Sequence, residues 1–202
     1  MDAIVGETNG KGGATIMLKL LKEFVEIYHL NKGLGELEYT SESLHVEKSN
    51  LSGQLKEFYQ HLSFNEEAYF RGAPYDLALF PLSSCEAAAE GWQDQGWKET
   101  YVVFAHLMGD EVIFCDLENN LSPVYGRIPG DSKLYPLSPS LSTFLTTYML
   151  MKKLEITKFE NDIYIDEALS DYKEGFLTGI MAIIEEQLPE AYRKDFIEFM
   201  LG

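Results

Sequence analysis

Hydrophobic residues in the first third of the chain recur with the period of an α-helix. Between Ile16 and Tyr28 they fall in pairs four residues apart, which places them along one side of a helix of about four turns. Residues 31–35 (NKGLG) then supply glycines of the kind that end helices. A similar spacing across residues 51–62 predicts a second helix.

A short hydrophobic run at residues 77–82 (LALFPL) predicts a strand that ends in a turn. Ser83 and Glu86 follow with the S-x-x-E spacing of a capping box, in which each side chain accepts a backbone N–H at the start of a helix. We therefore expect a short helix here that ends at Gly91.

The middle of the chain has the pattern of a β-hairpin. Residues 100–107 and 111–117 are rich in β-branched and aromatic residues, and the glycine-containing connection 108–110 joins them. A third strand is predicted at residues 123–126. Residues 127–139 hold three prolines and are predicted to form a loop.

The last third of the chain returns to helical periodicity. Ser138 or Ser140 is expected to cap a helix that reaches residue 154. Two more helices are predicted, one over residues 166–188 and one that begins at Pro189. Helices followed by an antiparallel sheet and then by helices predict an α+β fold.

Charge narrows the class of partner. The 202 residues include 33 acidic and 16 basic ones, for a net charge of −17. Such a chain repels phosphate backbones, so nucleic acid is not an expected partner. The same field attracts a basic protein, although a charged surface that simply keeps the chain soluble is an alternative.

Cellular location is inferred from three features. The first residues lack the basic and apolar regions of a secretory signal, and no apolar run approaches the length of a membrane span. Cys85 and Cys115 stand apart and outside any CxxC motif, which favours buried free thiols. The expectation is a cytoplasmic protein that is not bound to a membrane.

Signatures of catalysis and cofactor binding are missing from the sequence. The glycine-rich residues 6–13 lack the Walker A spacing, the four histidines lack metal-ligand spacing, and no G-x-S-x-G occurs. We therefore expect no catalytic residue, no metal site and no cofactor. Asp116 and Glu118 share one face of a predicted strand. They fit an acid/base pair or a calcium cluster, but solvent-facing residues are the favoured interpretation.

Five segments in the centre of the chain, in this order, resemble the SUKH superfamily, also called the Smi1/Knr4 family. The resemblance lies in a helix, a strand leading into a capped helix, a hairpin with Gly-Asp at its turn, a Pro-Val-Tyr strand and a Ser-x-x-x-Phe-Leu helix. The segments are residues 51–64 (LSGQLKEFYQHLSF), 79–92 (LFPLSSCEAAAEGW), 101–117 (YVVFAHLMGDEVIFCDL), 122–126 (SPVYG) and 137–150 (LSPSLSTFLTTYML).

The resemblance implies a SUKH-like core at residues 49–154, with an antiparallel or mixed sheet packed against helices. Residues 1–48 would add an N-terminal helical extension, and residues 155–202 would add helices packed on the core within a single structural domain. Many bacterial members of the family look like immunity proteins that bind and neutralise a cognate polymorphic toxin, often a nuclease. Fungal members are similar to interaction hubs.

We therefore expect a non-catalytic binding module for a basic protein toxin. The alternatives are a regulatory scaffold of the Smi1/Knr4 kind and, less favoured, a carboxylate-based hydrolase. Acids spread over an open surface would favour binding, whereas two carboxylates facing each other in a closed cleft would favour catalysis.

An acidic patch rimmed by aromatic residues is the predicted binding surface. Asp110 and Glu111 lie at the hairpin turn, and Trp92 and Trp97 flank a polar loop just before the sheet. The tryptophans are candidates either for core anchors of that loop or for interface residues. Glu66 and Glu67 would join the patch if the second helix packs beside the hairpin.

The C-terminal helices are more apolar than a lone helical pair requires. Packing of these residues onto the core is the favoured interpretation, and formation of a homo-oligomer through them is the alternative. The residues are Phe176, Ile180, Phe196, Phe199 and Met200.

Overall fold

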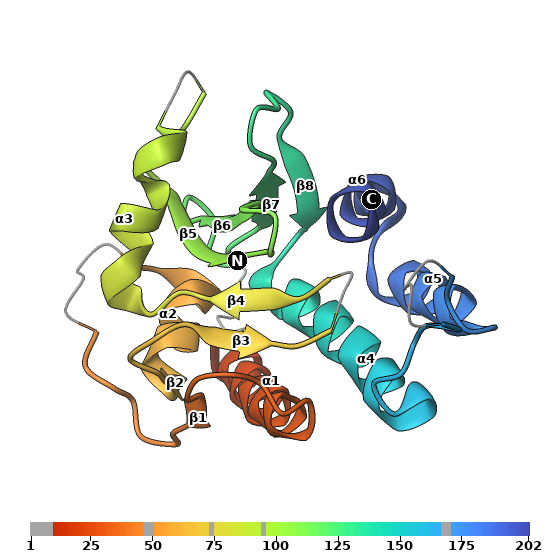
Figure 1. Ribbon diagram of the computed structural model, residues 1–202. Helices are drawn as coiled ribbons and strands as arrows, with labels where there is room; N and C mark the ends of the chain where they lie inside the picture. The colour runs from red at the N-terminus through yellow and green to blue at the C-terminus, as the bar shows by residue number, and fades with distance from the viewer. Residues whose placement is uncertain (1–9, 47–50, 73–74, 94–95, 167–170) are drawn as a thin grey trace, which may run out of the picture.

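A computed structural model describes residues 10–46, 51–72, 75–93, 96–166 and 171–202. In these residues the chain has the predicted α+β fold, and along the sequence helices stand both before and after the strands of the sheet (Figure 1). The helices are α1 (Gly10–Leu30), α2 (Gly53–His61), α3 (Cys85–Ala89), α4 (Leu141–Phe159), α5 (Phe176–Gln187) and α6 (Glu190–Leu201). Single 3₁₀ turns, Leu82–Ser84 and Glu90–Trp92, precede and follow α3.

The strands form a six-stranded sheet in which every neighbouring pair is antiparallel and follows chain order. Its strands are β3 (Ala68–Phe70), β4 (Leu77–Leu79), β5 (Tyr101–His106), β6 (Val112–Asp116), β7 (Val124–Arg127) and β8 (Tyr135–Ser138). A two-stranded sheet joins β1 (Glu38–Tyr39) to β2 (Leu62–Ser63). The predicted hairpin is confirmed as β5 and β6.

Both edge strands of the large sheet have neighbours. Leu34 and Tyr69 exchange backbone hydrogen bonds of 2.9 and 2.8 Å, so the middle of β3 is already paired. At the other edge, α6 packs along β8, which contains Pro136 and therefore lacks one N–H.

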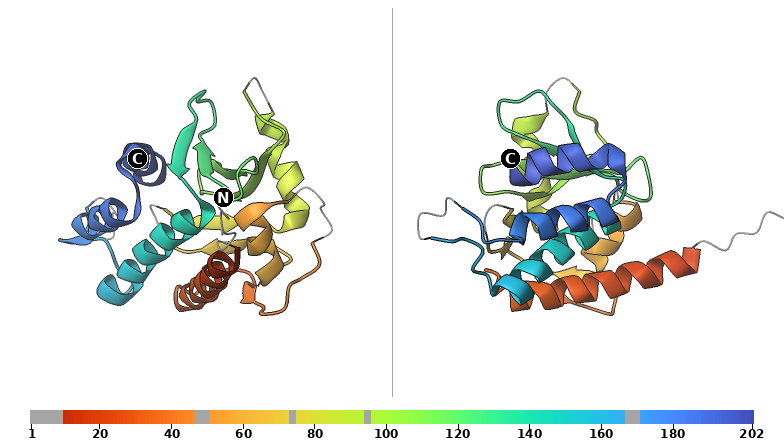
Figure 2. Two further views of the ribbon diagram at one scale, coloured as in Figure 1. Left: turned by 180° about the vertical axis from the view of Figure 1, so that it is seen from behind. Right: turned by 90° about the vertical axis from the view of Figure 1, so that its right-hand side faces the viewer.

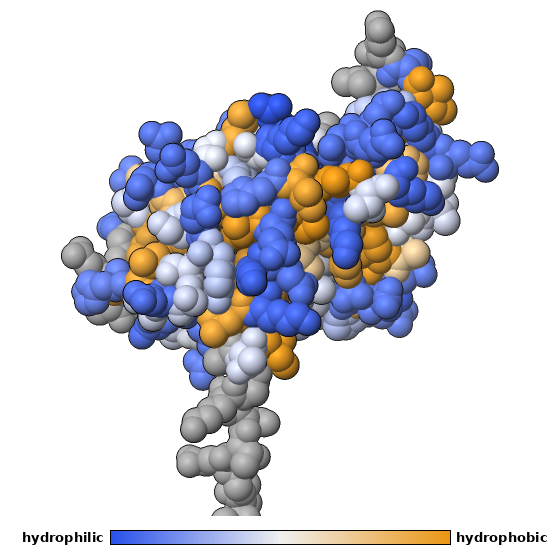
Figure 3. Space-filling view, turned by 90° about the horizontal axis from the view of Figure 1, so that it is seen from below, coloured by the Kyte–Doolittle hydropathy of each residue, from blue (hydrophilic) through white to orange (hydrophobic). Residues whose placement is uncertain are grey.

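One face of the sheet, which we call the sealed face, is covered by α1, α2, α4 and α6 (Figures 1 and 2). A register shift in β5 turns both Phe104 and Ala105 toward this face, while Val103 on the opposite face pairs with Phe114. The resulting core contains most of the fully buried aromatic rings. From below, hydrophobic patches alternate with polar side chains on the outer surface (Figure 3).

The N-terminal helix is part of the core. Phe24 and Tyr28 of α1 pack against Phe70 of β3 at ring distances of 4.9 and 5.0 Å, and α1 also contacts α2 and α4. The expected boundary between residues 48 and 49 lies outside the described residues. Since α1 supplies buried residues from Met17 to Tyr28, it is integral to the sealed face.

The predicted boundary after residue 154 falls inside α4, which continues to Phe159. Ser140 is confirmed as the cap of this helix, because its hydroxyl accepts the Thr143 N–H at 3.0 Å. The next helix, α5, begins at Phe176 and not at residue 166 as predicted.

The C-terminal helices are buried against the rest of the chain. The side chains of Phe176, Ile180, Phe196, Phe199 and Met200 are at most 5% exposed. Gly126 of β7 makes room for α6, since a Cβ atom there would lie 2.4 Å from the Phe199 ring. The apolar residues that suggested self-association as an alternative are therefore buried by contacts within a single chain.

The prediction of a loop over residues 127–139 is wrong in part, because β8 lies within it. The strand β8 lies at the edge of the sheet, where a proline such as Pro136 is tolerated although it has no N–H to donate. The sequence prediction also missed β3, which is only three residues long.

Candidate functional site

The β5–β6 turn presents two of the predicted acids at the end of the hairpin. The Leu107 N–H donates to the Glu111 carbonyl at 2.9 Å, and the Asp110 N–H donates to the Leu107 carbonyl at 3.2 Å. Asp110 has a φ of +67°, a conformation that aspartate tolerates better than most residues. The Asp110 side chain is exposed and Glu111 is half-buried.

His106 connects this turn to the acids that precede β3. Its Nε2 lies 3.2 Å from Glu67 Oε2, its Nδ1 lies 3.0 Å from the Leu107 carbonyl, and its ring stacks on Phe80 at 4.8 Å. The hairpin thus reaches Glu66 and Glu67 through the pairing of β3, β4 and β5. The second helix does pack against the hairpin, with the Phe58 ring of α2 lying 6.0 Å from the Phe104 ring of β5. The contact between the hairpin and these acids is made by Glu67, in the loop after β2.

A further acid, Glu36, lies beside Glu66. These two glutamates, with Gly35 and Asn65, line a cavity of about 230 Å³. We call Glu36, Glu66, Glu67, Asp110 and Glu111 the acidic edge.

The second face of the sheet carries a layer of aromatic rings. Trp97 lies 4.8 Å from the ring of Phe114 and 5.3 Å from that of Tyr101. Tyr125 stacks on Phe114 at 5.9 Å. Phe114 is fully buried beneath these rings, whereas Trp97, Tyr101 and Tyr125 are half-buried.

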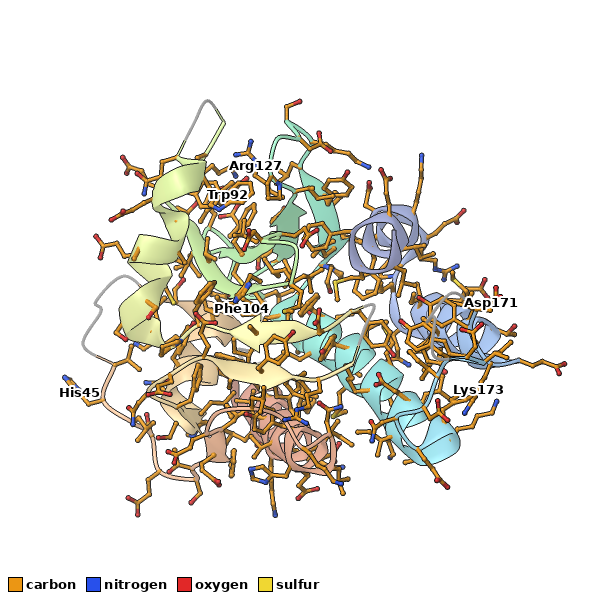
Figure 4. The ribbon with its side chains drawn as sticks, viewed as in Figure 1. His45, Trp92, Phe104, Arg127, Asp171 and Lys173 are labelled. Carbon is orange, nitrogen blue, oxygen red and sulfur yellow. The ribbon has the colours of Figure 1, made fainter. Side chains whose placement is uncertain are left out.

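Trp92 extends this layer toward β7, where Arg127 holds it. The Arg127 guanidinium donates to the Trp92 carbonyl at 3.3 Å, and its carbon lies 5.7 Å from the centre of the Trp92 ring (Figure 4). We call Trp92, Trp97, Tyr101, Tyr125 and Arg127 the open face. Trp92 and Trp97 therefore pack on the sheet while remaining partly exposed.

The acidic edge and the open face adjoin through one residue. Val112 pairs with His106 on one side and with Arg127 on the other. His106 contacts Glu67, and Arg127 contacts Trp92. The six predicted site residues thus fall in two neighbouring groups, with the four acids at the edge and the two tryptophans on the face.

Asp116 and Glu118 are held by a lysine between them. Lys98 Nζ lies 2.9 Å from Asp116 and 3.0 Å from Glu118, and Thr100 donates to Asp116 at 2.9 Å. Burial raises the pKa of Asp116, but hydrogen bonds from the Glu118 N–H, Lys98 and Thr100 outweigh it and lower the pKa below its usual value. Through these bonds, Asp116 and Glu118 connect the chain before β5 to the end of β6. This arrangement fits neither the acid/base pair nor the solvent-facing residues that the sequence suggested.

An ion pair that the sequence did not predict is buried in α4. Lys152 Nζ donates to Glu155 at 3.0 Å and to the carbonyls of Arg71 and Gly72 at 2.8 and 3.0 Å, and it lies 4.4 Å from the Tyr75 ring. Burial lowers the pKa of Lys152, while Glu155 opposes this shift. All three donors of the ammonium are used, so the pair ties α4 to the β3–β4 connection.

The two cysteines are buried thiols that form no disulfide, as predicted. In the described part of the chain, no group of three or more histidine, cysteine, aspartate or glutamate side chains is arranged to hold a metal ion. No described helix is both long and apolar enough to cross a membrane.

The chain matches none of the protein-family models, curated proteins or solved structures with which it was compared.

Proposed function

We propose that the chain is a non-catalytic protein-binding module whose partner is a basic protein. The observation that carries this proposal is the position of the acidic edge directly beside the open face. Carboxylates at an exposed rim attract a cationic partner and set its orientation, while half-exposed aromatic rings supply apolar contact area.

The partner class that best fits this surface is a toxin, and the role is that of an immunity protein that binds and neutralises it. The SUKH-like order of segments and the net charge of −17 both support this role. A basic nuclease gains association rate from such a field, and occupying its cationic substrate site is sufficient to inhibit it.

A binding experiment with matched charge changes tests the proposal. The edge variant combines Glu66→Lys, Asp110→Asn and Glu111→Lys, with asparagine chosen because it tolerates the positive φ at position 110. The control variant changes the total charge equally at exposed positions of α5 and α6, through the substitutions Glu185→Lys, Glu186→Lys and Glu190→Gln.

Tagged parent, edge variant and control variant are each incubated at low salt with extract of the source organism. We expect parent and control to recover one basic protein at one-to-one stoichiometry, and the edge variant to lose it. Raising the salt to about 0.5 M, where the Debye length is a few ångströms, should release the partner. No stoichiometric basic protein, or equal recovery by the edge variant, would contradict the proposal.

A further inference from the structure

The open face is the part of the sheet that the chain's own helices leave least covered. Four helices cover the sealed face, whereas α3, a helix of five residues, is the main cover that the described chain provides on the other face (Figure 1). Trp92, Trp97, Tyr101 and Tyr125 keep part of each ring exposed. Tryptophan, tyrosine and arginine are the residues most enriched at the energetic centres of protein interfaces.

Charge around this face is strongly one-sided. Residues 77–127, which build α3, the hairpin and β7, contain eight acids and two bases, Lys98 and Arg127. Both cations are engaged within the chain, Lys98 by Asp116 and Glu118, and Arg127 by Trp92. The surroundings of the open face are therefore complementary to an added cation.

The chain's own cations demonstrate how this face holds positive charge. Arg127 lies over the Trp92 ring while bonding its carbonyl, and Lys98 lies 5.4 Å from the centre of the Tyr101 ring while paired with two carboxylates. In both cases an aromatic ring contacts the cation and an oxygen acceptor binds it. An arginine from another protein would be recognised by the same two contacts.

We propose that the open face is the apolar half of the partner interface, and that it takes a segment of the basic partner with a hydrophobic centre and arginines at both ends. This inference rests on the proposed function. Acids flank β6 at both ends, with Asp110 and Glu111 before it and the exposed Glu118 beyond its last residue, Asp116. A strand of this length spans about 16 Å, which sets the spacing between the two groups of arginines.

Tryptophan fluorescence reports directly on binding at the open face, because Trp92 and Trp97 are the two tryptophans of the chain. The probe is the peptide RRLFLRR, which contains neither tryptophan nor tyrosine, and the matched control is EELFLEE. We expect RRLFLRR to shift the emission saturably at low salt, with about tenfold weaker binding at high salt. The acidic peptide should leave the emission unchanged.

Variants of the open face locate the binding. Tyr101→Ser combined with Tyr125→Ser should weaken peptide binding about tenfold, while Tyr39→Ser, at a half-buried tyrosine of the small sheet, should change it less than about twofold. Tyr125→Lys supplies a second test that keeps a long side chain and adds a repelling charge. A Tyr125→Lys protein that binds RRLFLRR as tightly as the parent would overturn the inference.

Other occupants of the face give different results. An emission shift that depends on protein concentration without peptide would indicate a second copy of the chain, and it would also overturn the inference. If the one-to-one basic partner is lost by the edge variant but retained by the Tyr101→Ser, Tyr125→Ser protein, the proposed function stands and the open face is not part of the interface. If the parent protein itself binds no basic partner, both the proposed function and this inference fail.

Discussion

The two faces of the six-stranded sheet differ in how the chain covers them. The sealed face lies under α1, α2, α4 and α6, and its rings, such as Phe104, are fully buried. The open face has α3 beside it and a layer of rings that stay half-exposed. The same strands supply both faces, because alternate residues of a strand point to opposite sides.

Under the proposed function, this difference separates the residues that stabilise the fold from those that recognise a partner. Burial of large side chains supplies most of the free energy that stabilises a fold. The residues of the sealed face should therefore contribute most of the stability of this protein. Residues of the open face are constrained less by packing and are available for contact with another protein. Substitutions on the two faces should therefore have effects of very different size.

The largest difference is expected between Phe104 and Tyr125. Phe104→Ala removes a fully buried ring that packs against Phe58 and Phe144, and should lower the free energy of unfolding by about 3–5 kcal/mol. Tyr125→Ala removes a half-exposed ring and should cost about 1–2 kcal/mol. Urea denaturation of both variants measures the difference, and equal losses would mean that the open face is as much a core as the sealed one.

The buried Lys152–Glu155 pair allows a second comparison, between two neighbouring lysines of α4, the helix that covers the sealed face. Lys152→Met leaves the Glu155 carboxylate buried without its cation and should cost about 3–5 kcal/mol, whereas Lys153→Met at the exposed neighbour should stay within about 0.5 kcal/mol. Adding Glu155→Leu to Lys152→Met should restore part of the loss, because the unpaired charge is gone. A double variant less stable than the single one in urea would contradict this account.

A smaller, pH-dependent effect on the free energy of unfolding is expected at Asp116, beside the open face. Asp116→Asn should lower the free energy of unfolding by about 1–3 kcal/mol at pH 7, because it weakens the bonds from Lys98 and Thr100. The folded-state pKa of Asp116 lies below its usual value, so its stabilising contribution is complete above about pH 4 and is lost as the pH falls through the folded pKa.

Denaturation of parent and Asp116→Asn protein at pH 7 and in steps below pH 4 measures this effect. The difference between the two proteins should shrink as the pH falls. Glu118→Gln is the control, since Glu118 is exposed and its bond to Lys98 is screened by solvent. A difference that grows in acid would show that Asp116 does not stabilise the fold as a carboxylate.

The smallest effect on stability is expected at the acidic edge. The edge variant replaces exposed or half-buried carboxylates that stand outside the core. Its free energy of unfolding should differ from that of the parent by no more than about 0.5 kcal/mol, so its melting temperature should change little. The edge should therefore alter binding without altering folding. A large fall in melting temperature would mean that these acids support the fold.

Long periodic segments made much of the fold predictable from the sequence. The helix around Phe24, the β5–β6 hairpin and the helix capped by Ser140 each repeat a pattern often enough to exclude the alternatives. Strands β3 and β8 are as short as β4 and β7, but β3 follows the polar residues 65–67 and β8 lies among three prolines, so neither has a pattern typical of a strand. They form because β4 and β7 present unpaired edges to them, which is a tertiary cause.

The candidate site was predictable only as separate pieces. The acids at the hairpin turn and the two tryptophans could be named from their positions, but contact between Glu67 and His106 depends on three strands coming together. The Lys152–Glu155 pair was missed because its i,i+3 spacing is also that of an ordinary exposed pair. The neighbouring Arg71 and Gly72 carbonyls, which complete its binding, are distant in sequence.

Occupied edge strands have a consequence for how this protein behaves in a crowded solution. A bare strand edge invites another chain to extend the sheet, and this is a common route to aggregation. Here Leu34 already pairs with β3, and α6 together with Pro136 obstructs β8. Association with other proteins is thereby directed away from backbone pairing and toward side-chain surfaces, where amino-acid substitution can tune specificity one residue at a time.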